Sequence, residues 1–383
     1  MTALLRFNNL SLCHRITGSS LMQSLQPLLP SRMVAACLWL QCFASMAAVT
    51  PPWHIGATTL ADQAPSSIES YTIAPGPHSV VVAVIDSGVL PHPNLTHALL
   101  AGMDMVSAAT NLRGARSGNY APDERDARCG AKVVSSTFRT HGTEVSSVIA
   151  GDGNEGMVGV NPQAKILPVR IFGACGMLMQ DMIDAIQWSA GLPVSGLALN
   201  ANPAKVINIS ISGGSFQCTP ALQKAIDGAI AKGIFIVAAA GNNFQKSLAE
   251  PANCNGVISV GAVGADNKIE RYSALDPRTT LYAPGGGPKL DTSALWGVNK
   301  IRVASYALSL FGQEQAVVLD KAVGTSFAAP VVAGYVSLWL SHHPEKTPTD
   351  WQTELPQFLR QVAPLDKCSA CLPGGLLANQ KAF

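Results

Sequence analysis

Residues 80–86 read VVVAVID, a continuous run of small and β-branched apolar side chains that ends on a carboxylate. An unbroken run of this kind is typical of a strand that is buried on both faces, as the strands of parallel sheets are. Four more such runs follow along the chain: KILPVRIF (165–172), KVINISI (205–211), GIFIVAAA (233–240) and GVISVGAV (256–263). The sequence therefore predicts a largely parallel central sheet.

Two segments between these predicted strands have apolar residues at helical spacing. They read DMIDAIQWSAG (181–191) and ALQKAIDGAIAKG (221–233), and the second closes on Gly233, a residue that commonly ends helices. Strands that alternate with helices predict βαβ units, and hence an α/β fold in which helices cover a parallel sheet. We expect one α/β domain over residues 76–383.

The composition is that of an ordinary globular protein. The chain has 383 residues, of which 48% are hydrophobic and 13% charged, with 34 Gly and 25 Pro. So few charges and so much Gly and Pro argue against coiled coils and long solvated helices. Lys and Arg number 26 against 24 Asp and Glu, so no basic excess indicates a nucleic-acid partner.

The N-terminal region of the chain is typical of an export signal. Residues 33–49 (MVAACLWLQCFASMAAV) form an apolar stretch just after Arg32, shorter than a membrane-spanning helix requires. Ser45 and Ala47 place small side chains at the two positions that signal peptidase requires for cleavage after Ala47. This predicts a signal peptide over residues 1–47, with Met22 or Met33 as alternative starts. An uncleaved anchor or a buried helix is the other interpretation of this stretch.

The segment after the leader, residues 48–75, is short and polar, and we expect it to open the mature chain. Secretion is then predicted, either to the exterior or to a periplasm, with no membrane span left after cleavage.

The cysteines agree with export, because an even number lies outside the leader. An even set suits disulfides in an oxidising compartment, although six cysteines allow fifteen connectivities. The last two form a CxxC, which also occurs in redox and zinc sites, but no second CxxC accompanies it and a small structural loop is favoured. The six are Cys129, Cys175, Cys218, Cys254, Cys368 and Cys371.

Four polar residues stand where an α/β sheet commonly carries its chemistry. Asp86 ends a predicted strand, and Asn242 follows another; His141 and Ser326 each precede a predicted helix. Taken singly, each has a simpler explanation: a turn or helix cap for Asp86, a surface or capping role for His141, and a Gly-Asn turn for Asn242. Ser326 is not part of a Gly-x-Ser-x-Gly motif, which argues against an α/β-hydrolase.

Taken together, the segments around these residues resemble the motifs of the subtilisin-like serine proteases, the subtilase family, and in particular its secreted, disulfide-bearing bacterial members. The order Asp, His, Ser is that of subtilisin. The resemblance implies a subtilisin-like three-layer fold, with a mostly parallel central sheet flanked by helices. The segments are VAVIDSG (82–88), THGTEV (140–145), VINISISGG (206–214), VAAAGN (237–242), APGG (283–286) and GTSFAAPVVAG (324–334).

The resemblance also implies a role for each residue in a serine endopeptidase that cleaves proteins or peptides. Ser326 would be the nucleophile, His141 the general base, and Asp86 the group that orients the imidazole. Asn242 and the Ser326 backbone N–H would form the oxyanion hole. This chemistry requires no cofactor.

Substrate would bind as an extended strand between two segments of the enzyme. By resemblance, the small residues of the pocket leave room for an apolar side chain, so we expect a broad or apolar preference at the cleavage position. The expected substrate-binding residues are Gly173, Ala174, Ser210, Ile211, Ser212, Gly213, Ala239, Ala240 and Gly241.

The resemblance further suggests the disulfide pairs Cys129–Cys175, Cys218–Cys254 and Cys368–Cys371. The resemblance leaves a structural calcium ion open, but the long loop over residues 104–128 lacks the carboxylate-dense spacing of a calcium site, so the sequence points to no metal-ligating residues.

The chain departs from the family pattern at several places. Glu144 stands where the family usually has a second His, Ser212 stands where a Gly is usual, and Val331 stands where a His is common. The family's folding prodomain has no recognisable counterpart in residues 48–75, which implies a separate inhibitor or chaperone, unaided folding, or a truncated gene. The alternative to an active enzyme is therefore a catalytically impaired, subtilase-like binding protein. A third interpretation keeps the catalytic residues but transfers the acyl group to an amine.

Overall fold

A computed structural model describes residues 74–108, 116–122, 138–173, 175–242, 247–265, 268–287, 300–308, 314–360 and 375–377. The predicted signal peptide, most of residues 48–75, and Cys129, Ala174, Cys368 and Cys371 lie outside these ranges, so the predictions for them stay predictions. Within the described ranges, no helix combines the length and the apolar character needed to cross a membrane.

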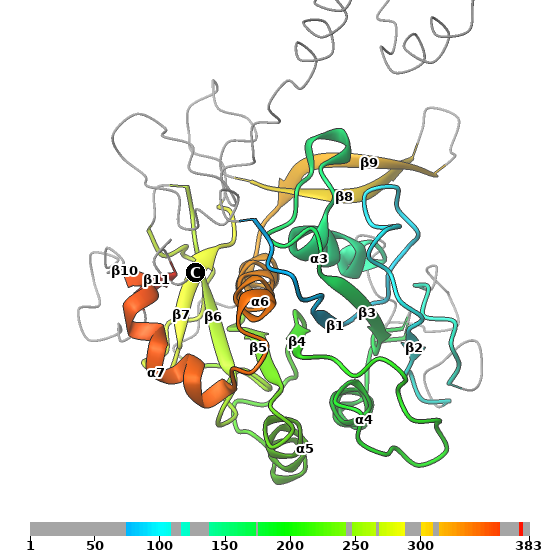
Figure 1. The fold of residues 1–383 in the computed structure, drawn as a ribbon, viewed down its shortest axis with the longest axis vertical. Helices are drawn as coiled ribbons and strands as arrows, with labels where there is room; N and C mark the ends of the chain where they lie inside the picture. The colour runs from blue at the N-terminus through cyan, green and yellow to red at the C-terminus, as the bar shows by residue number, and fades with distance from the viewer. Residues whose placement is uncertain are drawn as a thin grey trace, which may run out of the picture. The chain divides into compact units, whose positions relative to one another are not determined.

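The described strands form one large sheet and one hairpin (Figure 1). The large sheet is parallel except for its last pair, β10 with β11. Its nine described strands run in the spatial order β10-β11-β7-β6-β5-β4-β1-β3-β2. Their bounds are β1 Val81–Asp86, β2 Met103–Asp104, β3 Lys165–Arg170, β4 Val206–Ile209, β5 Phe235–Ala239, β6 Ile258–Val263, β7 Leu281–Pro284, β10 Leu359–Arg360 and β11 Gly375–Leu377.

Helices cover both faces of this sheet, which gives the three-layer α/β fold that the sequence predicts. The helices are α3 His141–Ala150, α4 Met179–Ser189, α5 Pro220–Ile230, α6 Thr325–His342 and α7 Pro348–Phe358, with a short 3-10 turn, η4, at Asn154–Gly156. In β1, Val82 and Val84 join the core formed with α3 and α6, whereas Ala83 and Ile85 join the core formed with α4 and α5. A strand between two cores needs apolar side chains at every position, which explains the unbroken run.

The strand order reverses at β1, and this determines where polar groups can gather. β1 pairs in parallel with β3 on one side and with β4 on the other. In open α/β sheets, ligands bind outside the carboxyl ends of the strands at such a reversal. Asp86 is the last residue of β1 and Ser210 directly follows β4, so both lie at this edge.

The hairpin of β8 (Ile301–Leu308) and β9 (Glu314–Ala322) is antiparallel and packs on α3. The Ala304 backbone N–H donates to Ser147 Oγ on α3 at 3.0 Å, which fixes the hairpin to that helix. The chain passes from β9 into α6 within a few residues. The hairpin therefore connects α3 to the start of α6.

Helix α3 can approach β1 only because its second residue is Gly142. A Cβ built on Gly142 would lie 2.2 Å from the backbone oxygen of Gly88 and 3.2 Å from the Asp86 Cβ. The first distance is far below any normal contact, and the neighbour is backbone that cannot move aside.

We therefore expect Gly142→Ala to lower the free energy of unfolding by about 1–3 kcal/mol, the usual cost of overpacking a close contact. Denaturant unfolding measures this loss. Gly214→Ala is the matched control, because Gly214 is exposed and a Cβ there meets nothing within 4 Å. Equal stability of the two variants would contradict the close approach.

Candidate active site

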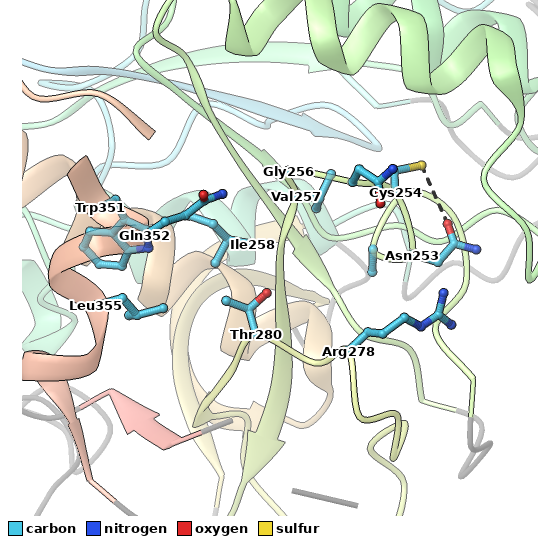
Figure 2. A pocket seen from close by; sticks show the side chains of 12 residues that line it. Asn253, Cys254, Gly256, Val257, Ile258, Arg278, Thr280, Trp351, Gln352 and Leu355 are labelled. Atoms are coloured by element: carbon cyan, nitrogen blue, oxygen red, sulfur yellow. Dashed lines mark hydrogen bonds between the residues drawn. The ribbon is translucent and has the colours of Figure 1, made fainter. Parts of the chain in front are cut away.

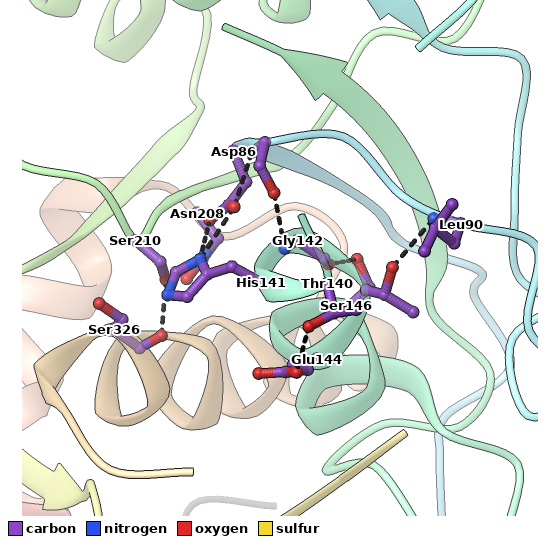
Figure 3. Close-up of polar contacts among 12 residues, drawn as sticks. Asp86, Leu90, Thr140, His141, Gly142, Glu144, Ser146, Asn208, Ser210 and Ser326 are labelled. Carbon is purple, nitrogen blue, oxygen red and sulfur yellow. Dashed lines mark hydrogen bonds and ion pairs between the residues drawn. The ribbon is translucent and has the colours of Figure 1, made fainter. Parts of the chain in front are cut away.

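Asp86 and His141 form a hydrogen-bonded pair at the carboxyl end of β1 (Figure 3). His141 Nδ1 lies 2.9 Å from Asp86 Oδ1 and 3.0 Å from Oδ2, and the Ser87 backbone N–H donates to Oδ1 at 2.6 Å. The Asp86 side chain has no exposed surface and that of His141 is 12% exposed. Because Asp86 accepts only, Nδ1 is the protonated nitrogen of a neutral ring, and Nε2 keeps its lone pair.

Two phenylalanines hold the His141 ring in place. Phe138 stacks on it with ring centroids 4.9 Å apart and an angle of 9°, and Phe327 packs at 5.4 Å. Phe138 in turn contacts Phe172, at a centroid distance of 4.3 Å. Sequence reasoning missed Phe138, because no motif marks it and the contact is made only when the chain folds.

The surroundings raise the pKa of His141 above its usual value of 6.5. Burial of the ring acts to lower the pKa, but the charge of Asp86 and its hydrogen bond raise it, and the charge of Glu144 adds to that effect. Lys321 works in the opposite direction and lowers it. The site thus favours the imidazolium that forms when His141 takes a proton.

Ser326 stands in the first turn of α6, a helix that is almost entirely buried. From Thr325 to Ser341, Ser326 is the one residue of this helix that is not buried. Figure 3 shows the ring of His141 between Asp86 and Ser326. A hydroxyl at the start of a helix also faces the positive end of the helix dipole.

A short polar chain fixes the backbone of Ser326. Ser210 Oγ donates to the Ser326 carbonyl at 2.8 Å and accepts from Asn208 Nδ2 at 3.0 Å. Asn208 is fully buried in β4 and was not singled out by sequence reasoning. A polar residue inside the apolar run 205–211 was the signal that could have found it.

Asn242 lies beside the same helix start and is anchored through its side-chain oxygen. Oδ1 accepts from both the backbone N–H and the hydroxyl of Thr325, each at 2.8 Å. The anchoring leaves Nδ2 as the free donor of an exposed side chain, and Nδ2 makes no hydrogen bond among the described residues. Gly324, with φ +147°, passes so close that a Cβ would lie 3.2 Å from this Nδ2.

The expected substrate-binding residues fall on two segments near these groups. Gly173 bridges back to Gly176, and after β4 Ser210, Ile211 and Gly213 are buried whereas Ser212 is exposed. The Gly213 backbone N–H donates to the Glu250 carbonyl at 2.7 Å, so it is engaged within the chain. Ala239 and Ala240 are buried at the end of β5, and Gly241 follows them.

One cavity among the described residues lies away from the candidate site. A cavity of about 370 Å³ lies between α7 and the segment 252–258 (Figure 2). Trp351 and Leu355 of α7 face Ile258 and Thr280 across it, and Arg278 stands at its rim. None of Asp86, His141, Asn242 and Ser326 lines this cavity, so it is separate from the candidate site.

One of the expected disulfides is present in the described chain. Cys218 and Cys254 are bonded, with Cα atoms 5.1 Å apart. Cys175 is also disulfide-bonded; its expected partner, Cys129, lies outside the described residues. Among the described residues, no group of three or more His, Cys, Asp or Glu side chains is arranged to hold a metal ion.

Comparison with known proteins identifies the family of this chain. The sequence profile of Peptidase_S8, the subtilase family, matches residues 78–364, well over half of the chain. The chain belongs to the subtilase family. The segments that carry the resemblance noted in the sequence all lie within the matched range.

Subtilases of known structure share the fold. A protease of Pseudoalteromonas arctica superimposes with a TM-score of 0.70 and 32% identity, covering 86% of this chain and 95% of that one. Two curated subtilase relatives are an extracellular protease of Xanthomonas campestris (38% identity, 74% of this chain) and an extracellular basic protease of Dichelobacter nodosus (37%, 68%). The matched regions cover only 47% and 43% of these two relatives.

The raised pKa of His141 predicts how this residue affects the stability of the subtilase fold. A His with a pKa above 6.5 in the folded chain stabilises the fold fully below pH 6.5, and this contribution is lost as pH rises through the folded pKa. The loss of unfolding free energy caused by His141→Gln should therefore shrink as pH rises from about 6 to 10.

Denaturant unfolding at several pH values measures this difference. Both chains should carry Ser326→Ala, so that self-digestion cannot interfere. A difference that stays constant, or grows, with rising pH would contradict the raised pKa.

Proposed function

We propose that this subtilase is a secreted serine endopeptidase in which Asp86, His141 and Ser326 form the catalytic triad. The observation that carries the proposal is the buried Asp86–His141 pair beside the one unburied residue of the α6 start, Ser326. The relatives' names, extracellular protease and extracellular basic protease, support the same reaction. The chemistry requires no metal or cofactor, because the side chains and water supply every group.

The proposed reaction has two stages. Ser326 Oγ adds to the scissile carbonyl while His141 Nε2 takes the hydroxyl proton, and Asp86 stabilises the imidazolium. The imidazolium then gives this proton to the leaving amine, the C–N bond breaks, and an acyl-enzyme remains. Water repeats the attack in the second stage, which releases the acid and restores Ser326.

The oxyanion would be held by Asn242 Nδ2 and the Ser326 backbone N–H. The two hydrogen bonds from Thr325 to Asn242 Oδ1 hold the amide rigid before substrate arrives. Donors that are held in place beforehand stabilise developing charge without reorganisation.

Proposed specificity follows from the small residues after β5. Ala239, Ala240 and Gly241 carry no charge and leave room for a sizeable apolar side chain at the cleavage position. Glu250, a nearby acidic residue, is 1% exposed and its carboxylate accepts from the Thr219 backbone N–H at 2.6 Å. An engaged, buried carboxylate does not select basic substrates, so we propose a broad or apolar preference.

Export is proposed from three observations that agree. The leader at residues 1–47 is typical of a signal peptide, the two relatives are named extracellular, and the Cys218–Cys254 disulfide suits an oxidising compartment.

A fluorophosphonate probe tests the proposed nucleophile directly. The purified chain should be labelled at Ser326 and should cleave peptides, and Ser326→Ala should abolish both while its unfolding curve stays unchanged. Ser341→Ala is a matched control, since Ser341 is buried on the same helix, far along it, and should leave labelling intact. A folded chain that is not labelled would favour the impaired binding protein, or a form that awaits a separate partner.

Replacement of Asn242 should slow the chemical step. We expect Asn242→Ala to lower kcat by about 10²–10³ with little change in KM, as loss of an oxyanion donor does. Asn242→Asp keeps the acceptor for Thr325 but removes the donor, so it should lose at least as much activity. Steady-state kinetics on a peptide substrate measure both variants. Full activity in Asn242→Asp would exclude Asn242 as an oxyanion donor.

A further inference from the structure

Glu144 is a buried carboxylate one turn after His141, at the position where the subtilase family usually has a second His. Its side chain is only 5% exposed. Thr140 Oγ1 donates to Glu144 Oε1 at 2.6 Å, and Ser305 Oγ donates to the same oxygen at 2.7 Å. Lys321 Nζ lies 2.6 Å from this oxygen as well. One atom thus gathers donors from three separate parts of the chain.

These donors connect the elements that carry the proposed catalytic residues. Thr140 is the residue just before α3, which begins with His141. Ser305 belongs to β8, and Lys321 belongs to β9, shortly before Ser326. Ser147 makes a second link, because its Oγ accepts from the Ala304 backbone N–H at 3.0 Å. Helix α3 is therefore held against the hairpin that leads into α6.

The cluster is balanced in charge. A carboxylate this buried is costly unless it is paired, and loss of one partner leaves an uncompensated charge. Lys321 supplies the opposite charge while its own side chain stays 37% exposed. Glu144 and Lys321 therefore form one paired unit.

We propose that Glu144 and Lys321 form a positioning pair that aligns helix α3 with the β8–β9 hairpin, and that their opposite charges adjust the pH range of the proposed reaction. The inference rests on the proposed protease function, because the pH range concerns His141 as its general base.

The two charges act on His141 in opposite directions. Glu144 raises the pKa of His141 and Lys321 lowers it, beside the larger effects of burial and of Asp86. The charged groups that act on the ring are thus Asp86 from β1, Glu144 from α3 and Lys321 from β9. A residue with a purely structural role would not shift the pH profile in a direction set by its charge.

The test compares the acidic limb of the kcat/KM profile in two variants. Glu144→Gln keeps the size of the side chain and an acceptor for Thr140 and Ser305 but removes the charge, so the limb should move to lower pH. Lys321→Met removes the opposite charge, so the limb should move to higher pH. Lys346→Met is the matched control, since Lys346 pairs with Glu354 near α7, and it should leave the limb in place.

The alignment of helix α3 with the hairpin is tested separately, by the plateau value of kcat. Glu144→Ala removes the acceptor as well as the charge, and should lower the plateau kcat by up to about 10²-fold, as small misplacements of catalytic groups do. Glu144→Gln should recover most of this loss. Ser305→Ala keeps the ion pair intact and serves as a milder variant if Glu144→Ala fails to fold.

An NMR titration of the His141 ring separates this inference from the proposed function. In a Ser326→Ala background, with His141→Gln used for assignment, Glu144→Gln and Lys321→Met should move the His141 pKa in opposite directions. These shifts are expected even if the chain proves to hydrolyse nothing. Shifts of the same sign in both variants, or no shift in either, would overturn the proposal.

Discussion

The carboxylate of Asp86 ends a strand packed between two apolar cores, and it has no exposed surface. A charge in that position must be paired and hydrogen-bonded, or the fold loses several kcal/mol. The Ser87 N–H and His141 satisfy it, and His141 reaches it because Gly142 lets helix α3 approach the backbone of Gly88. The requirement of one buried charge thus fixes a strand end, a helix start and an imidazole together.

Two buried carboxylates, Asp86 and Glu144, lie near His141, and their surroundings give them different roles. Asp86 bonds to the ring itself, so it controls which nitrogen carries the proton. Glu144 does not bond to the ring; its charge is balanced by Lys321 and its oxygen holds two hydroxyls. The same functional group therefore serves as a direct partner at one site and as an anchor between elements at the other.

Much of this architecture could be predicted from local sequence, and the limits of that prediction are physical. The β-branched runs predict strands because burial on both faces excludes polar residues, and Asp86 is conspicuous because it ends such a run. The partners of Glu144 could not be predicted, since Ser305 lies 161 residues away and no local pattern encodes that contact. Phe138 was missed for the same reason, whereas Asn208 was marked in the sequence as a polar residue inside an apolar run, although its partners Ser210 and Ser326 are brought together only by folding. The Cys218–Cys254 pairing came from resemblance, as spacing alone left fifteen choices.

The Cys218–Cys254 bond spans a sequence separation of 36 and encloses all of α5 and β5. A cut inside this covalent loop would leave both fragments attached through the bond, next to the strand β5 that pairs with β4 and β6 in the intact chain. The bond therefore keeps the two pieces of a chain that is cut in this loop within one molecule.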